Sequence, residues 1–294
     1  MLFINLSVLI TTSSMFIIVE SGSTKADWVV VRSKDDTQFF KTEGINPATQ
    51  TELLDLTKDK ALLEVIREAK YIYFYGAGII DKVSTSRIGD WLSAAGFTGK
   101  ISVAEDMIAA ARACCGDEPG IVCILGTGSN SCVYDGTKII RAIPTLGYIF
   151  SDEGGGTHIG KEILKSYFYG IMPEKEKEIF NAHFSVTKEL LVEKVYRTSE
   201  GNKYVASFAQ FLVLIDGPWK ETLIKKVFRD FITLRIMLYP EHTSHNIKFV
   251  GSIAHYHHQY LHEVMNEFGL KTDEIIQQPI YKLIDYHLKH KIHE

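Results

Sequence analysis

The segment FIIVESGSTKADWVVVR (residues 16–32) decides the fold class, because it reads as two apolar strands joined by a glycine turn. IVCILGTGSNSCVYDGTKIIRA (121–142) repeats this arrangement later in the chain. Glycine lets backbone amides approach a ligand closely, and amides with neighbouring Ser and Thr hydroxyls form a concave nest for phosphate oxygens. One such hairpin is commonly only a turn. Two of them predict a chain of two similar halves, each with a phosphate-binding hairpin.

Neither hairpin carries the better-known nucleotide motifs. The sequence contains no GxxxxGK[ST] loop, and neither turn is a GxGxxG that opens a helix. Outside the hairpins, strand and helix patterns alternate, which predicts an α/β fold. Apolar positions at near-helical spacing predict three helices before residue 120, over 49–69, 81–95 and 107–115.

Apolar runs predict the remaining strands. Those before residue 120 cover 71–78 and 101–105, and Phe39 and Phe40 lie in a further strand. Beyond residue 157 the pattern is mostly helical, and only 246–252 reads as a strand. Because no low-complexity linker divides the chain, any domain boundary falls within 103–120.

The composition narrows the class of protein. The 294 residues are 46% hydrophobic and 23% charged, which excludes a disordered chain, and their length predicts two domains. A net charge of −4 disfavours nucleic-acid binding but allows a local site for a nucleotide with its magnesium. Four cysteines without CxxC spacing are too few for a disulfide scaffold, so we expect a cytoplasmic protein.

The first residues are a separate question. Residues 2–10 are mostly apolar but too few to span a bilayer as a helix, so we expect no membrane association. Phe16 opens the first convincing strand, which favours Met15 as the true start and residues 1–15 as a non-native or flexible extension. The alternative is a weak export or anchor signal.

Several segments, taken jointly and in order, resemble one known family. They are IVESGSTKADW (18–28), EGINP (43–47), YGAG (75–78), ILGTGSNSCVYDG (124–136), LGYIFSDEGGG (146–156) and FVGSIA (249–254). The chain resembles the BadF/BadG/BcrA/BcrD ATPase family of the actin-like ATPase and sugar kinase superfamily, and its N-acetylglucosamine kinase-like branch in particular. The resemblance runs over nearly the whole chain from Phe16.

The resemblance implies two ribonuclease H-like domains with a nucleotide cleft between them. We expect an N-terminal domain over 1–108, a C-terminal domain over 109–280, and a final helix over 281–294 that packs back on the first domain. The implied activity is the ATP- and Mg²⁺-dependent phosphorylation of an amino sugar, most naturally of N-acetylglucosamine to N-acetylglucosamine 6-phosphate. The resemblance also allows a homodimer. Two alternatives stay open, an ATPase that activates a reductase or dehydratase, and a non-catalytic sugar or nucleotide sensor.

The resemblance also implies the nucleotide site. The ATP-binding residues would come from the two hairpins and one later turn: Ser21, Gly22, Ser23, Thr24, Gly126, Thr127, Gly128, Ser129 and Gly251. Glu20 stands where the family usually has an aspartate that helps to hold hydrated Mg²⁺. Glutamate keeps the charge but adds a methylene, so the sensor alternative gains some support. The alternative interpretation of Glu20 is a solvent-exposed carboxylate at the end of a strand, without a role in binding.

The catalytic and sugar-binding residues follow in the same way. Asp106 matches the family's catalytic base, although a helix N-cap would explain an aspartate at this position equally well. The sugar-binding residues would be Asn46, Asp106, Thr127, Asp152 and Glu153. An Asn-Pro turn is the alternative for Asn46, and an acidic loop before a helix is the alternative for the acidic pair.

Overall fold

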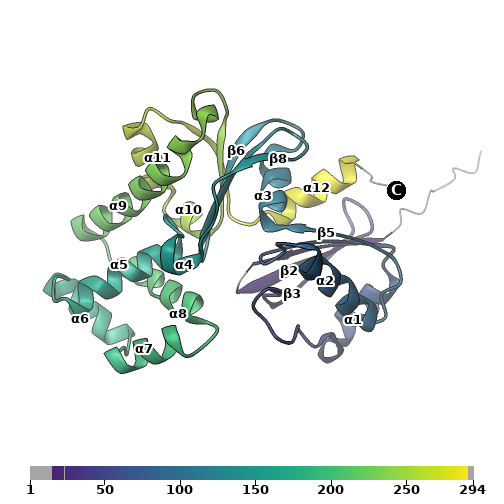
Figure 1. Cartoon of the computed structure of the whole chain (residues 1–294), viewed down its shortest axis with the longest axis horizontal. Helices are drawn as coiled ribbons and strands as arrows, with labels where there is room; N and C mark the ends of the chain where they lie inside the picture. Colours follow the sequence, from purple (N-terminus) through teal and green to yellow (C-terminus); the bar gives the residue numbers. More distant parts are fainter. Residues whose placement is uncertain (1–14, 23, 291–294) are drawn as a thin grey trace, which may run out of the picture.

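The computed structural model describes residues 15–22 and 24–290. The interpretation of residues 1–15 as an extension therefore lies outside the described residues, apart from Met15, and so does the assignment of Ser23. Two five-stranded sheets form the centre of the chain (Figure 1). Their strands are β1 (Phe16–Ser21), β2 (Lys25–Val31), β3 (Thr37–Glu43), β4 (Tyr71–Gly76), β5 (Lys100–Glu105), β6 (Gly120–Leu125), β7 (Ser129–Tyr134), β8 (Ile139–Ala142), β9 (Ile247–Val250) and β10 (Thr272–Ile276).

The two sheets share one topology. The first has the order β3-β2-β1-β4-β5, and the second, read from its other edge, has the order β8-β7-β6-β9-β10. In each, a three-stranded antiparallel meander is extended by two parallel strands. The expectation of two similar α/β halves, each with one hairpin, is confirmed. A single continuous sheet would have contradicted it.

Two strands of the second sheet were not predicted. The segment 132–142 contains a turn at Asp135 and Gly136 that separates β7 from β8. β10 lies at the edge of the sheet, and its first three residues are polar and exposed or partly buried, so its sequence (TDEII) has no long apolar run. Edge position and partial exposure explain why a search for apolar runs misses this strand.

The helices fill the remainder of the chain. They are α1 (Lys60–Glu68), α2 (Lys82–Ala94), α3 (Asp106–Cys115), α4 (Gly147–Phe150), α5 (Gly156–Phe168), α6 (Glu174–His183), α7 (Lys188–Tyr196), α8 (Gly201–Ser207), α9 (Pro218–Leu234), α10 (Ser252–Tyr256), α11 (His258–Glu267) and α12 (Ile280–His290). The long helix predicted over 49–69 is wrong in its first half. Asp55 caps a short 3-10 turn and Asp59 caps α1, so two N-caps interrupt the apolar pattern.

Helix α3 lies between the two sheets, with α12 beside it (Figure 1). Ala109 and Ala113, one turn apart, pack into the core that contains β1, β4 and α12. Met107, Ala110 and Cys114 pack into the core of the second sheet. A helix whose opposite faces belong to different cores connects the two halves. The domain boundary between residues 108 and 109 falls inside this helix and stays a prediction.

The last helix returns to the first sheet. α12 packs against α3, β1 and β2, and the ring of His287 lies 3.9 Å from that of Tyr73. His287 Nε2 also lies 2.8 Å from the hydroxyl of Tyr75. The expected return of a final helix is therefore present over 280–290, while 291–294 lie outside the described residues. Among the described helices, none is long and apolar enough to cross a membrane.

Candidate active site

Two carboxylates lie at the same edge of the first sheet. Glu20 is the penultimate residue of β1, and Asp106 directly follows β5. Both strands run parallel to β4, which lies between them, with Glu20 paired to Tyr75 and Glu105 to Gly76. Parallel strands end at a common edge, and ligands of open α/β sheets bind outside the carboxyl ends of the strands. The topology therefore places Glu20 and Asp106 at one prospective binding edge.

Burial and like charges raise the pKa of both carboxyl groups. For Glu20 burial is the largest cause, and the nearby carboxylates of Asp106 and Asp27 add to it, raising the pKa to about 7 against an opposing effect of Lys25. For Asp106 burial again leads, followed by the charge of Glu105, and the pKa rises to about 6. Perturbed carboxyl groups that share a site are candidates for acid–base chemistry or for binding a cation.

Asp27 is an acidic residue of this edge that sequence reasoning missed. It lies directly opposite Glu20 in the β1–β2 pair, is buried, and forms an ion pair of 2.7 Å with Lys25. Its position next to the apolar run of β2 was the available signal, because a carboxylate that is buried at the start of such a strand needs a partner.

The first hairpin is anchored by a serine whose hydroxyl is already in use. Ser21 Oγ donates to the carbonyl oxygen of Ile45 at 3.0 Å and accepts from the Ile45 amide at 2.7 Å. Gly22 N donates to the carbonyl oxygen of Lys25 at 3.0 Å and closes the turn. The Ser21 side chain therefore holds the 43–47 segment against the hairpin, and its hydroxyl is not free for a phosphate.

The second hairpin is held from behind by the start of α5. The amides of Gly156 and Thr157 donate to the carbonyl oxygens of Gly126 and Thr127 at 2.8 and 2.9 Å. A Cβ at Gly155 would lie 2.6 Å from the backbone of Gly128, so glycine is required there for this close approach. Gly155 and Gly156 thus support the hairpin, whereas Gly154 lies against the side chains of Phe231 and Leu125.

The two hairpins meet. The hydroxyl oxygens of Thr24 and Thr127 lie 3.4 Å apart, and the two residues belong to the turns of hairpins in different sheets. The buried hydroxyl of Ser129, at the start of β7, has no hydrogen-bond partner within the described part of the chain. A buried hydroxyl without a partner is costly unless a ligand or water completes it. The phosphate-binding residues predicted from separate segments are therefore close together in space.

Gly251 lies against the same hairpin. Its φ of 117° is in the region that favours glycine, and a Cβ there would overlap the carbonyl oxygen of Leu125 and lie 3.2 Å from the Gly126 amide nitrogen. Gly251 directly follows β9 and precedes α10, which agrees with the predicted strand-to-helix turn. Gly251 therefore packs against the backbone of the second hairpin.

Asp152 faces the second hairpin from the other side. Its Oδ1 accepts from the Ser129 amide at 3.2 Å, and its Oδ2 from the Thr157 hydroxyl at 3.4 Å. Its φ of 69° is the one positive value among the described residues other than glycine. Burial raises the pKa of its carboxyl group. Backbone strain of this kind is commonly kept where it serves a site.

Glu153 has a different role in the structure from its neighbour. Its Oε2 lies 3.0 Å from a terminal nitrogen of Arg235, which directly follows α9 and is 4% exposed at its side chain. Arg235 was missed, because an arginine at the end of a helix has no local signal for its distant partner. The two acidic residues therefore have different partners. Asp152 accepts hydrogen bonds at the second hairpin, and Glu153 forms an ion pair with the buried Arg235.

Asn46 lies at the carboxyl edge of the first sheet. Its Oδ1 accepts from the Ala48 amide at 3.0 Å, which is the hydrogen bond of an Asn-Pro turn. The side chain also contacts the loop after β4, where a Cβ at Gly78 would overlap Asn46 Oδ1. The turn interpretation thus accounts for the carbonyl end of the side chain, in a position beside the strand that separates Glu20 from Asp106.

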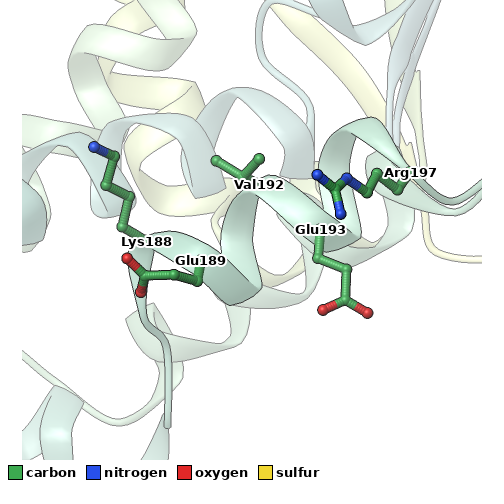
Figure 2. Close-up of a pocket in the computed structure, with 5 residues that line it drawn as sticks. All are labelled: Lys188, Glu189, Val192, Glu193 and Arg197. Carbon is green, nitrogen blue, oxygen red and sulfur yellow. The ribbon is translucent and has the colours of Figure 1, made fainter.

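One surface hollow lies away from these groups. It is lined by exposed residues of α7 and the residue that follows, and the side chains spread along the helix without converging on a point (Figure 2): Lys188, Glu189, Val192, Glu193 and Arg197. No hairpin residue lines it. It offers no arrangement of reactive groups comparable with the edge that carries Glu20 and Asp106.

Comparison with solved structures identifies the superfamily. A putative N-acetylglucosamine kinase from Porphyromonas gingivalis is 34% identical, with 95% of this chain and all of that chain covered and a TM-score of 0.84. The chain belongs to the actin-like sugar kinase superfamily. The narrower BadF/BadG/BcrA/BcrD assignment stays a prediction.

More distant members of the superfamily share the fold. A putative N-acetylglucosamine kinase from Chromobacterium violaceum is 16% identical, covers 94% of this chain and 99% of its own, and has a TM-score of 0.62. A ROK hexokinase from Thermus thermophilus is also 16% identical, with 92% and 97% covered and a TM-score of 0.52. No family model matches the chain, and no curated protein is significantly similar to it.

Proposed function

We propose that the protein transfers the γ-phosphoryl group of ATP to a hydroxyl of an amino sugar, with N-acetylglucosamine as the substrate and N-acetylglucosamine 6-phosphate as the product. The observation that carries the proposal is the position of Asp106, a half-buried carboxylate at the strand edge that also carries Glu20. The relative that is 34% identical over nearly the whole chain supports the choice of sugar.

Asp106 is the proposed general base. The sugar hydroxyl oxygen forms a bond to the γ-phosphorus, the bond to the bridging oxygen of ADP breaks, and the hydroxyl proton passes to the Asp106 carboxylate. A pKa of about 6 leaves most of this group ionised at neutral pH while it remains more basic than an ordinary aspartate. Asp106 is the first residue of α3, and the N-cap position before it belongs to Glu105, whose side chain forms no cap hydrogen bond. The alternative interpretation of Asp106 as a helix N-cap is therefore wrong.

Glu20 is the proposed contact for Mg²⁺. Glu20, Asp27 and Asp106 concentrate acidic groups at one edge, and burial, followed by repulsion from Asp106 and Asp27, raises the pKa of Glu20. A bound cation would relieve both penalties. Within residues 15–22 and 24–290 no three acidic, histidine or cysteine groups gather as a metal cage. Mg²⁺ bound with a nucleotide commonly uses one or two carboxylates, phosphate oxygens and waters, so this donor set fits. Bound Mg²⁺ would neutralise charge on the phosphates.

The two hairpins are the proposed phosphate cradle. Gly22 and Thr24 would act from the first sheet, and the second sheet would contribute Gly126, Thr127, Gly128 and Ser129. Ser21 supports the cradle through Ile45, and Gly251 borders it where the adenosine would lie. The proposed sugar contacts remain Asn46, Asp106, Thr127, Asp152 and Glu153. Of these, Glu153 would act with its charge largely compensated by Arg235.

A panel of amino sugars with MgATP tests the proposal. N-acetylglucosamine, glucosamine, N-acetylmannosamine and N-acetylmuramic acid would each be incubated with the protein, with ADP and sugar phosphate both measured. Formation of sugar phosphate supports the kinase. ADP formation without dependence on sugar would indicate an ATPase activator, and binding without turnover would indicate a sensor. Asp106→Asn controls for a contaminating kinase.

The activator alternative can also be judged from the cysteines. All four are buried, and burial raises the pKa of the Cys115 thiol to about 11. Thiolates are the form that binds metal clusters, so these buried cysteines are poor ligands.

The cytoplasmic location and the homodimer remain predictions. Light scattering on the purified protein tests the second of these.

A further inference from the structure

The segment 143–153 connects β8 to α5 and ends in the acidic pair. It contains the single-turn helix α4, and its apolar side chains Leu146, Ile149 and Phe150 are 65%, 66% and 78% exposed. Burial of these side chains therefore contributes little to the position of the segment. Ile143, at the start of the segment, packs against the core of the second sheet, and polar contacts hold the rest.

Arg235 supplies most of those contacts. One terminal nitrogen donates to the carbonyl oxygens of Ile143 and Pro144 at 3.3 and 2.9 Å. The other donates to Glu153 Oε2 at 3.0 Å and to the hydroxyl of Ser151. A single guanidinium thus grips the segment at its start and near its end, which the planar fork of arginine permits and the point charge of lysine does not.

Two further side chains support this arrangement. Lys161 Nζ donates to the carbonyl oxygen of Tyr148 at 2.7 Å. The hydroxyl of Tyr239 accepts from the Ile143 amide at 3.0 Å and donates to the carbonyl oxygen of Ser131 in β7 at 2.8 Å. Arg235 and Tyr239 both lie in the corner after α9, which therefore ties the segment to the second sheet.

The contacts of Arg235 bracket Asp152. Ser151 and Glu153 are the residues on either side of it, and Asp152 itself has a φ of 69°. A residue outside the common backbone regions keeps its conformation only when its surroundings determine it. Here Arg235 fixes Ser151 and Glu153, and these two residues determine the backbone conformation of Asp152. A guanidinium that is nearly inaccessible to water also needs a compensating charge, which Glu153 provides.

We propose that Arg235 is a positioning residue for the sugar end of the site. It holds the segment 143–153 so that Asp152 keeps its orientation toward the second hairpin, and it engages Glu153 for this purpose. The inference rests on the proposed function, because it assumes that Asp152 contacts the sugar. This proposal has a specific consequence. A substitution of Arg235 should weaken sugar binding and leave ATP binding almost unchanged, because other contacts hold the hairpins.

Arg235→Lys tests the proposal, with Arg229→Lys as the matched control. Arg229 lies on α9 and forms a two-pronged ion pair with Glu267 at 2.7 and 2.8 Å, on the exposed surface. With N-acetylglucosamine and MgATP, we expect Arg235→Lys to raise the KM for sugar about tenfold, equivalent to about 1.4 kcal/mol. The KM for ATP should stay within about twofold. Arg229→Lys should change neither constant.

A milder variant keeps the test meaningful if Arg235→Lys folds poorly. Ser151→Ala removes one hydrogen-bond acceptor of the Arg235 guanidinium and leaves both proposed sugar-binding carboxylates in place, so it should raise the KM for sugar in the same direction by a smaller factor. Equal increases in the KM for sugar and for ATP in both variants would overturn the positioning role. So would a loss of thermal stability with unchanged kinetics.

Failure of the proposed function would be visible separately. If the wild-type protein phosphorylates no sugar, hydrogen exchange of the unliganded protein still reports on the segment. Faster exchange over 143–153 in Arg235→Lys than in Arg229→Lys, with unchanged exchange in β1, would support the positioning role of Arg235. Identical exchange in the two variants would refute it.

Discussion

The hydroxyl oxygens of Thr24 and Thr127 lie 3.4 Å apart, although 103 positions separate the two residues in the chain. Each belongs to a glycine hairpin of a different sheet, and each sheet has the same strand order. The contact brings together the two segments predicted to bind phosphate. A nucleotide between them would therefore touch both halves of the protein at once.

This relationship predicts coupling between the two ligands. Phosphates cradled from both sheets, and a sugar held by Asn46 and Asp152 from opposite sheets, each favour the same closed arrangement. We expect N-acetylglucosamine to tighten the binding of a non-hydrolysable ATP analogue, and the analogue to tighten sugar binding by the same factor. Calorimetric titration of each ligand with and without the other measures both factors. Independent affinities would mean that the two halves do not respond to their ligands.

Asp106→Asn should lower kcat by about 10²–10⁴, the usual contribution of a general base. The affinity for ATP should change little, because the amide keeps the size of the carboxyl group. In the wild-type protein only the ionised carboxylate accepts the proton, so kcat/KM for sugar should fall as the pH drops below about 6. A variant with unchanged kcat would show that Asp106 is not the general base.

Glu20→Asp should keep or increase activity, because it restores the shorter carboxylate that the resemblance associates with the magnesium site. Glu20→Ala should require much more Mg²⁺ for half-maximal activity, since the carboxylate proposed to hold the metal is lost. Titration of activity with Mg²⁺ at constant ATP compares the three proteins. Superimposable curves for wild type and alanine would make Glu20 a bystander.

Glu20→Gln should stabilise the protein at the expense of activity. The pKa of Glu20 is raised from 4.5 to about 7, so the folded state holds a proton that the unfolded chain releases between these pH values. Stability is thus lost as the pH rises through this range, and the full penalty applies above it. At pH 8 without nucleotide, glutamine should add on the order of 2 kcal/mol to the free energy of unfolding.

The same experiment has an internal control in pH. Toward pH 4 the wild-type carboxyl group is protonated in both states, so the advantage of glutamine should vanish there. Glu64→Gln, on the exposed face of α1, should have no comparable effect at either pH. Denaturant unfolding at both pH values measures the difference. Equal stability of wild type and Glu20→Gln at pH 8 would contradict the assigned electrostatic penalty.

Gly251→Ala should impair nucleotide binding more than its small size suggests. The added methyl group would overlap the Leu125 carbonyl oxygen, and alanine disfavours the φ of 117°. The second hairpin, which Leu125 precedes, would have to move. We expect a KM for ATP raised at least about tenfold, equal to about 1.4 kcal/mol, or a destabilised protein of similar cost. Gly170→Ala, at an exposed turn with open space around it, separates the φ penalty from the overlap.

Sequence reasoning succeeded where neighbours along the chain decide the structure. Both hairpins, the strand that leads to Asp106 and the turn at Gly251 are local patterns of apolar residues and glycine, and all of them appear in the structure. It failed for β10, whose pairing with β9 is decided by the sheet edge, and for the first half of 49–69, where two aspartate caps outweigh the apolar pattern.

Only the tertiary structure decided which partner each polar side chain has. The sequence alone determined that the chain contains two glycine hairpins and an acidic pair before a helix. It could not determine that Ser21 is committed to Ile45, that Asp27 faces Glu20, or that Glu153 is engaged by Arg235. The physical reason is that a buried polar group is stabilised by a partner in space, and 82 positions separate Glu153 from Arg235 in the chain. Local periodicity contains no information about contacts at that distance.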